Sequence, residues 1–322
     1  MKKSERTPIR DRDLIFIPFD DREQWLQIRR GYLGGSDAGA VIGMNKYGSA
    51  VSVWAEKTGK APEFGGNTAT NVGTYLEDLV AKLFMEETGK TVRRLKFTIV
   101  NPAYPFACAN IDREVLCEDA ILECKTTTNI GNISKMRSGE CPDQWYAQVT
   151  HYMAVTGAKK AYLAALENNQ KLHIFEIERD EDEINALMEA ERAFWEDYVI
   201  GDKMPTADGS DATSETIKRL FPVDDGESMD LSEFDGDLIR RDAISRQIKD
   251  LEKEVDEIDN RIKAEMKDCS TGDSGRFSVS WKTQTRSKFD KDRLAADRPD
   301  LDLAKYTTVT QSRVFRVKEN KS

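Results

Sequence analysis

The sequence has few histidines and cysteines and lacks any long hydrophobic run. Only two histidines occur among 322 residues, so we expect neither a histidine-rich metal centre nor a paired-histidine phosphodiesterase. The five cysteines are odd in number and form no Cys-x-x-Cys pair, which indicates neither a zinc ribbon nor a disulfide framework. Any catalytic metal must therefore be bound by oxygen, which favours magnesium or manganese.

The hydropathy pattern contains no membrane or export signal. No run approaches the roughly 18 apolar residues of a membrane span, and the polar, basic N-terminus lacks the apolar stretch of a signal peptide. We therefore expect a cytoplasmic protein without a membrane partner.

The composition is that of an ordinary globular protein, with 39% hydrophobic and 33% charged residues. The length is compatible with about two domains. A formal net charge of −10 argues against a protein that coats nucleic acid over its whole surface. It leaves room for a channel with locally basic walls, to which residues 29–30 and 93–96 could contribute.

The order of expected elements indicates an α/β core with a mixed sheet. Capping signals and apolar spacing predict the helices, and period-two alternation between turn-forming residues predicts the strands. Helices are expected over 23–30, from 36, over 49–57, 71–88, 142–156 and 181–199, and strands over 91–100, 106–116, 121–125, 160–167 and 171–178.

The chain is expected to divide into a first domain over 1–205, an acidic and polar linker over 206–233, and a C-terminal unit over 234–322. In the C-terminal unit, apolar residues recur at spacings of four and three, which predicts a helix with a heptad seam. The seam would pack against a partner helix or a neighbouring subunit, although one face of an ordinary helix gives the same spacing. Alternation over 277–281 and 313–317 predicts small strands. The seam residues are Ile244, Ile248, Leu251, Val255, Ile258 and Ile262.

Two carboxylates and an ammonium stand where a core strand should be apolar. In the run 121–125, Glu123 and Lys125 point to the same face because strand side chains alternate. If 106–116 forms the neighbouring strand, Asp112 joins them. A buried acid pair beside a lysine is costly unless cations and hydrogen bonds compensate it. The pattern indicates a divalent-metal site for hydrolysis, whereas a surface strand with a salt bridge is the plain alternative.

Phosphodiester hydrolysis needs a deprotonated water and stabilisation of negative charge, and one or two magnesium ions held by carboxylates can provide both. Asp112 and Glu123 would be the central ligands, with the Cys124 carbonyl as a further oxygen. Glu77 would complete the set from its helix, or would pair with an arginine of the following strand. Lys125 would either position or deprotonate the water.

Gln148 and Tyr152 are four residues apart in a predicted helix and so share one face. In the functional interpretation, Gln148 binds the nucleophilic or metal-bound water and Tyr152 supports it. A half-exposed polar stripe on the helix would also place these two residues on one face.

Near the N-terminus, Gly34, Gly35 and Ser36 precede an apolar helix. Glycine lets the backbone approach a ligand closely, and a helix start offers free amides to a phosphate. Arg29 could bind the same phosphate. Such a pocket would suit a terminal 5′-phosphate, whereas simple capping of the helix by Ser36 explains the same residues.

Together these motifs resemble the YqaJ-type viral recombinases, the relatives of phage lambda exonuclease, over about residues 22–200. One departure is Arg113, where that family often has glycine, and Ile111 replaces the proline of the PD-(D/E)xK signature. The matching string is Arg29, Gly34-Gly35-Ser36-Asp37, Trp54 with Lys57-Thr58-Gly59, Gly73 with Glu77, Asp112, Glu123-Cys124-Lys125, and Gln148 with Tyr152.

The resemblance implies a PD-(D/E)xK, restriction-endonuclease-like core with a central mixed sheet flanked by helices. It implies an exonuclease that uses two Mg²⁺ ions, or Mn²⁺ in their place, to degrade one strand of duplex DNA from the 5′ end. The 3′ overhang would pass to a single-strand annealing protein. A closed homo-oligomeric ring, most commonly a trimer, would encircle the DNA end in the cytoplasm of a bacterium that carries the phage or prophage.

By residue match, the resemblance also implies roles for individual side chains. Metal ligands would be Glu77, Asp112 and Glu123, and Lys125 would be the catalytic lysine. Gln148 would assist in the active site. The 5′-phosphate anchor would be Arg29 with Ser36, beside Gly35.

Two other functions remain compatible with the sequence. One is a PD-(D/E)xK endonuclease with another cleavage mode; its iron–sulfur form, known from CRISPR adaptation, needs a cysteine cluster that this chain lacks. The other is a non-catalytic DNA-binding scaffold whose working part is the heptad helix. The presence of both acids, the lysine and Gln148 speaks against the scaffold.

Overall fold

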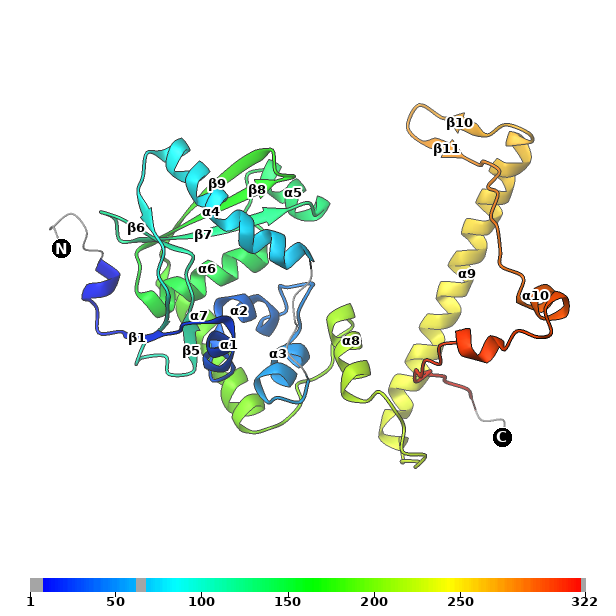
Figure 1. Cartoon of the computed structure of the whole chain (residues 1–322), viewed down its shortest axis with the longest axis horizontal. Helices are drawn as coiled ribbons and strands as arrows, with labels where there is room; N and C mark the ends of the chain where they lie inside the picture. The colour runs from blue at the N-terminus through cyan, green and yellow to red at the C-terminus, as the bar shows by residue number, and fades with distance from the viewer. Residues whose placement is uncertain (1–7, 62–67, 320–322) are drawn as a thin grey trace. The chain divides into compact units, whose positions relative to one another are not determined.

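A computed structural model describes residues 8–61 and 68–319 and divides the chain into two units, with the boundary along the chain between Phe221 and Pro222 (Figure 1). The first unit thus extends beyond the predicted end at 205. The difference arises from α8 (Asp211–Leu220), which packs on α3 (Ala50–Lys57) and buries Thr213 and Thr216. Because these buried side chains are threonines, the segment has the composition of a linker.

The first unit contains two mixed sheets. In the five-stranded sheet, of order β3-β6-β7-β8-β9, β7 and β8 are parallel and the other neighbours antiparallel. The four-stranded sheet has the order β1-β4-β5-β2. The predicted mixed α/β class is confirmed. The strands are β1 (Ile15–Pro18), β2 (Leu33–Gly34), β3 (Val92–Arg93), β4 (Phe97–Val100), β5 (Ala107–Ala109), β6 (Arg113–Val115), β7 (Ala120–Thr127), β8 (Lys160–Glu167) and β9 (Lys171–Glu178).

The strands predicted over 91–100 and 106–116 are each divided in two. In both cases the chain leaves one sheet and enters the other, since β3 and β6 belong to the five-stranded sheet and β4 and β5 to the four-stranded one. Asp112 lies in the second of these breaks, immediately before β6. It is therefore not a strand residue, as the sequence suggested, but a residue of the connection between sheets.

Most predicted helices are confirmed, with shifted ends. Helix α4 begins at Thr68, so Asn71 lies inside it and does not cap it. Helix α5, which Asn129 caps, was not predicted.

Among the described residues, no helix is both long and apolar enough to cross a membrane. Besides α3 and α8, the helices of the first unit are α1 (Arg22–Arg30), α2 (Gly35–Val41), α4 (Thr68–Thr88), α5 (Ile130–Arg137), α6 (Asp143–Thr156) and α7 (Glu181–Phe194), with a 3₁₀ helix at Pro8–Asp11 and a π-helix at Trp195–Ile200 that directly follows α7.

The five-stranded sheet lies between α4 on one face and α6 on the other. Along β7, Leu122 and Cys124 share a core cluster with Val80 and Phe84 of α4. Ile121 belongs instead to the cluster that contains Val149 of α6. Since side chains alternate along a strand, Glu123 and Lys125 must also lie on the α6 face.

The second unit is built around the long helix α9 (Asp235–Met266) and has almost no core. Met266 is the one buried residue among those described in this unit. The predicted strand over 277–281 is confirmed in β11, but residues 313–317 form no regular element, so that prediction was wrong. The other elements are β10 (Thr271–Asp273), β11 (Ser278–Ser280), α10 (Lys291–Asp297) and short turns at Ser232–Phe234 and Leu303–Tyr306.

A buried ion pair joins α6 to α7. Nδ1 of His151 lies 2.8 and 2.9 Å from the two carboxylate oxygens of Glu191, and Nε2 lies 2.9 Å from the carbonyl oxygen of Cys108. Because both ring nitrogens face acceptors, the charged, doubly protonated ring fits this site. Burial lowers the pKa of His151, but the Glu191 carboxylate and the Cys108 carbonyl raise it more, so the pKa lies above its ordinary value.

We expect this pair to make stability depend on pH. The folded-state pKa of His151 is above the unfolded value of about 6.5, so its contribution is complete below that pH and is lost as pH rises through the folded-state pKa. Glu191→Gln should cost about 3–5 kcal/mol at acidic pH and much less at alkaline pH. Urea midpoints at both pH values, with exposed Glu189→Gln as control, test this; a cost that does not change with pH would contradict it.

Candidate active site

A hydrogen-bonded network connects β7 to α6. Lys125 Nζ donates to Glu123 Oε1 at 2.6 Å and to Gln148 Oε1 at 2.8 Å. The amide nitrogen of Gln148 donates to the same Glu123 oxygen at 2.7 Å and to the hydroxyl of Tyr152 at 3.1 Å. Glu123, Gln148 and Tyr152 are all buried. The structure thus brings together four of the side chains that the sequence singled out.

Asp112 lies where the β6–β7 ladder ends. The ladder pairs Arg113 with Leu122 and Glu114 with Ile121. Beyond it, the backbone N–H of Cys124 donates to Asp112 Oδ2 at 2.7 Å. Burial, together with the charges of Glu123 and Glu77, raises the pKa of Asp112 well above its ordinary value. Asp112 is therefore close to Glu123, although it reaches that position from a connection and not from a strand.

Glu77 is bound by arginine. It accepts a hydrogen bond from Arg113, which also binds Asp78, and Arg94 Nη2 lies 3.7 Å from Glu77 Oε1. Arg113 is opposite Leu122 and so shares the face of the sheet that α4 covers. The sequence left open an arginine of the strand predicted over 91–100; Arg94 of that segment lies within ion-pair distance, but the hydrogen bond comes from Arg113 of the next predicted strand. Within residues 8–61 and 68–319, no group of three or more His, Cys, Asp and Glu side chains is arranged to hold a metal ion.

The pair Asp112 and Glu123 nevertheless fits a hard cation. Oε2 of Glu123 is buried and has no hydrogen-bond partner among the described residues. Such an oxygen is costly to bury. Burial also raises the pKa of Glu123, despite the neighbouring Lys125. Because magnesium and manganese prefer carboxylate oxygens, an ion bound by this pair would satisfy the free oxygen and offset the repulsion.

Lys125 is held in place as a charged donor. Burial lowers the pKa of Lys125, but Glu123 and Asp112 raise it more, so the pKa lies above its ordinary value in this ion-free site. Its two hydrogen bonds, to Glu123 and Gln148, fix the ammonium between β7 and α6. Its two predicted roles, to position or to deprotonate the water, stay predictions.

The predicted anchor residues also meet. Arg29 Nη2 donates to Ser36 Oγ at 2.9 Å. Beneath them, Asp37 lies 2.8 Å from Lys57 Nζ and 3.4 Å from Arg29 Nη2. Burial raises the pKa of Asp37, but Lys57 and Arg29 together lower it to about 2. The N–H of Gly34 donates to Asp37, so the side chain that serves the start of α2 is Asp37, and the capping role considered for Ser36 is wrong.

Gly35 is required by packing. A Cβ atom at this position would lie 2.4 Å from Cε1 of Tyr152, far inside van der Waals contact. The ring of Tyr152 therefore lies directly against the backbone at the start of α2. This contact joins the anchor to the network on α6.

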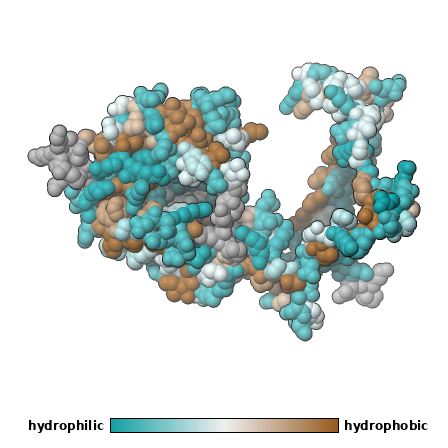
Figure 2. Space-filling view, in the orientation of Figure 1, coloured by the Kyte–Doolittle hydropathy of each residue, from teal (hydrophilic) through white to brown (hydrophobic). Residues whose placement is uncertain are grey.

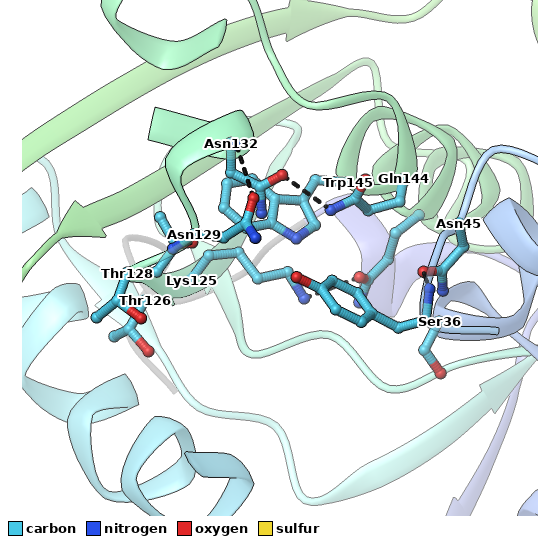
Figure 3. A pocket seen from close by; sticks show the side chains of 12 residues that line it. Ser36, Asn45, Lys125, Thr126, Thr128, Asn129, Asn132, Gln144 and Trp145 are labelled. Atoms are coloured by element: carbon cyan, nitrogen blue, oxygen red, sulfur yellow. Dashed lines mark hydrogen bonds between the residues drawn. The ribbon is translucent and has the colours of Figure 1, made fainter. Parts of the chain in front are cut away.

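One cavity connects the two groups of residues. Ser36, Lys125 and Gln148 all line a cavity of about 350 Å³, within the range of small-molecule sites. Figure 3 shows Lys125 extending into it from the side of Thr126 and Thr128, with Ser36 on the opposite side. The other lining residues are mostly uncharged and polar: Asn45, Tyr47, Thr126, Thr127, Thr128, Asn129, Asn132, Gln144 and Trp145.

Sequence reasoning missed part of this site. Lys57 was noted only as a motif residue, yet its side chain is fully buried against Asp37. Asn129 and Asn132 were missed because α5 was not predicted; the available signal was Asn129 itself, a preferred N-cap residue after three threonines.

Comparison with known proteins identifies relatives. A family model described as the YqaJ-like viral recombinase domain matches residues 24–159. The uncharacterized protein YqaJ of Bacillus subtilis (strain 168) is 37% identical over 303 residues, which cover 92% of this chain and 94% of that protein.

Two solved exonuclease structures are similar at lower identity. An alkaline exonuclease from Laribacter hongkongensis is 22% identical, with a TM-score of 0.48 and coverage of 56% of this chain and 94% of that one. A phage related exonuclease from Haemophilus somnus 129PT is 15% identical, with a TM-score of 0.41 and coverage of 56% and 100%.

The similarity to the Bacillus protein extends over nearly all of both chains, so it includes the second unit as well as the first. The family model covers the anchor, the acidic pair, Lys125 and Gln148. The chain belongs to the YqaJ-like viral recombinase family.

Proposed function

We propose that this protein is a magnesium-dependent exonuclease with a PD-(D/E)xK core, which degrades one strand of duplex DNA from its 5′ end. One observation carries the proposal: Ser36 of the anchor and Lys125 and Gln148 of the network line the same cavity. A phosphate anchor and a hydrolytic centre in one cavity suit a substrate that presents a terminal phosphate close to a phosphodiester. Family membership supports the same reaction class.

In this proposal, Asp112 and Glu123 hold Mg²⁺ or Mn²⁺, with the Cys124 carbonyl as a further ligand. Such an ion, when bound, lowers the pKa of water and stabilises negative charge on phosphate oxygens. The Lys125 ammonium would hold the attacking water and donate to the charged phosphate, and Gln148 would fix the orientation of Lys125. Tyr152 would in turn fix Gln148. Glu77 could assist a second ion only after it leaves Arg113.

The product and partners follow from the same reaction. Removal of nucleotides from a 5′ end leaves a 3′ single strand, which is the substrate of a single-strand annealing protein. A homo-oligomeric ring, of which a trimer is the form we propose, would keep the cavity on a duplex DNA end during successive cuts. The net charge of −10 would then require that acidic residues face outward and basic residues face the DNA.

Removal of the Lys125 ammonium should abolish most of the activity. We expect Lys125→Ala to slow magnesium-dependent digestion of linear duplex DNA by about 10²–10³-fold, because a preorganised positive charge is lost while DNA binding is retained. Exposed Lys159→Ala is the matched control. Rapid cleavage of closed circular DNA by the unmodified protein would instead show an endonuclease.

Ser36 should determine the response to a 5′-phosphate. We expect Ser36→Ala to lower the ratio of digestion rates on 5′-phosphorylated and 5′-hydroxyl ends by about tenfold, since a hydrogen bond to a charged group contributes about 1.5–3 kcal/mol. The rate on the 5′-hydroxyl duplex serves as the internal control. If the unmodified protein shows no phosphate preference, the anchor is wrongly assigned.

The ion-free acidic pair should limit stability. The raised pKa of Asp112 means that its charged form is disfavoured in the folded state, so at neutral pH Asp112→Asn should raise the Tm of the chelator-treated protein by about 2–4 °C. Mn²⁺ should raise the Tm of the unmodified protein and have little effect on the variant. Thermal unfolding with chelator or Mn²⁺, with exposed Asp182→Asn as control, tests this. Equal stabilisation of both proteins by Mn²⁺ would exclude Asp112 as a ligand.

A further inference from the structure

Helix α9 presents an unburied line of aliphatic side chains. Six residues at alternating spacings of four and three form this line, which we call the α9 seam. Each has an exposed fraction of 39–60%, and the one buried residue of the helix is Met266 at its end. Hydrophobic surface is visible along this helix in Figure 2. The seam consists of Ile244, Ile248, Leu251, Val255, Ile258 and Ile262.

The seam has the dimensions of a helix-docking surface. From Ile244 to Ile262 it extends about 27 Å along the helix axis. Its spacing keeps all six side chains on one side of a helix that pairs with another. A continuous apolar surface of this kind on an otherwise charged helix marks an interaction site.

The residues beside the seam determine which partner fits. In a paired helix, the positions that flank the apolar line face the flanking positions of the partner and select it by charge. Here the central flanking positions are acidic, and the one basic residue lies near the C-terminal end. The flanking residues are Ser245, Gln247, Glu252, Glu254, Asp259 and Arg261.

A second copy of the same helix fits poorly. In a parallel, in-register pair, Glu254 of one copy faces Asp259 of the other. In an antiparallel pair centred on the seam, Glu252 faces Glu252 and Glu254 faces Glu254. Both arrangements place like charges together beside a buried apolar contact, which is unfavourable.

We propose that the α9 seam binds an amphipathic helix of another protein, whose apolar stripe is flanked by lysine and arginine. Basic side chains at the partner's flanking positions would pair with Glu252, Glu254 and Asp259, while its aliphatic side chains cover the seam. This assignment concerns the second unit alone and does not depend on the proposed nuclease activity.

The test uses two synthetic 21-residue helical peptides with the same Ile/Leu stripe. One carries lysine at all flanking positions and the other glutamate. Fluorescence anisotropy with the full-length protein should show that the lysine peptide binds at least about tenfold more tightly at low salt, with the difference reduced at high salt. Leu251→Asp should abolish binding, whereas Asn260→Asp, which adds the same charge on the opposite side of α9, should not.

A charge-reversal variant keeps the test independent of folding defects. The double change Glu252→Lys with Glu254→Lys should reverse the preference in favour of the glutamate peptide. Equal binding of the two peptides, or no reversal, would overturn the charge assignment. If Leu251→Asp, but not Asn260→Asp, dissociates an oligomer of the protein in light-scattering measurements, a second copy covers the seam and the proposal fails.

Discussion

The alternation of side chains along β7 is the constraint on which the candidate site depends. Leu122 and Cys124 are buried under α4, so Glu123 and Lys125 must face α6. The apolar half of the strand fixes its position in the sheet and thereby places a carboxylate and an ammonium inside the protein, where hydrogen bonds are strong and unpaired groups are costly. A shift of one residue in the pairing with β8 would exchange the two faces and dismantle the site.

Local signals in the sequence were sufficient for the elements that carry most of the site. The acid and lysine of β7 were predicted from alternation, and Gln148 with Tyr152 from helical spacing; both expectations survive as direct contacts. The hairpin β8–β9 and most helices followed from caps and turns. These features are local because each depends on residues only a few positions apart.

The features that could not be predicted from the sequence depend on contacts between residues far apart in the chain. The division of two predicted strands between sheets depends on which strands meet, and a local pattern does not encode that. Helix α8 was hidden because its buried residues are threonines. The partner of Glu77 was also undecidable, because only the β6–β7 register shows that Arg113 emerges on the face that α4 covers. An arginine of the chain itself thus neutralises a carboxylate that the motif alone would assign to a metal.

The contact between Gly35 and Tyr152 has a consequence for how the protein can change over evolution. The same ring supports Gln148 on one side and leaves no space for a side chain at the start of α2 on the other. The proposed phosphate anchor and the proposed catalytic network are therefore mechanically linked. Altered selectivity at Ser36 or Arg29 would have to arise without moving this backbone, so tolerated variation should concentrate on the opposite rim of the cavity, among the amides and hydroxyls of residues 126–132.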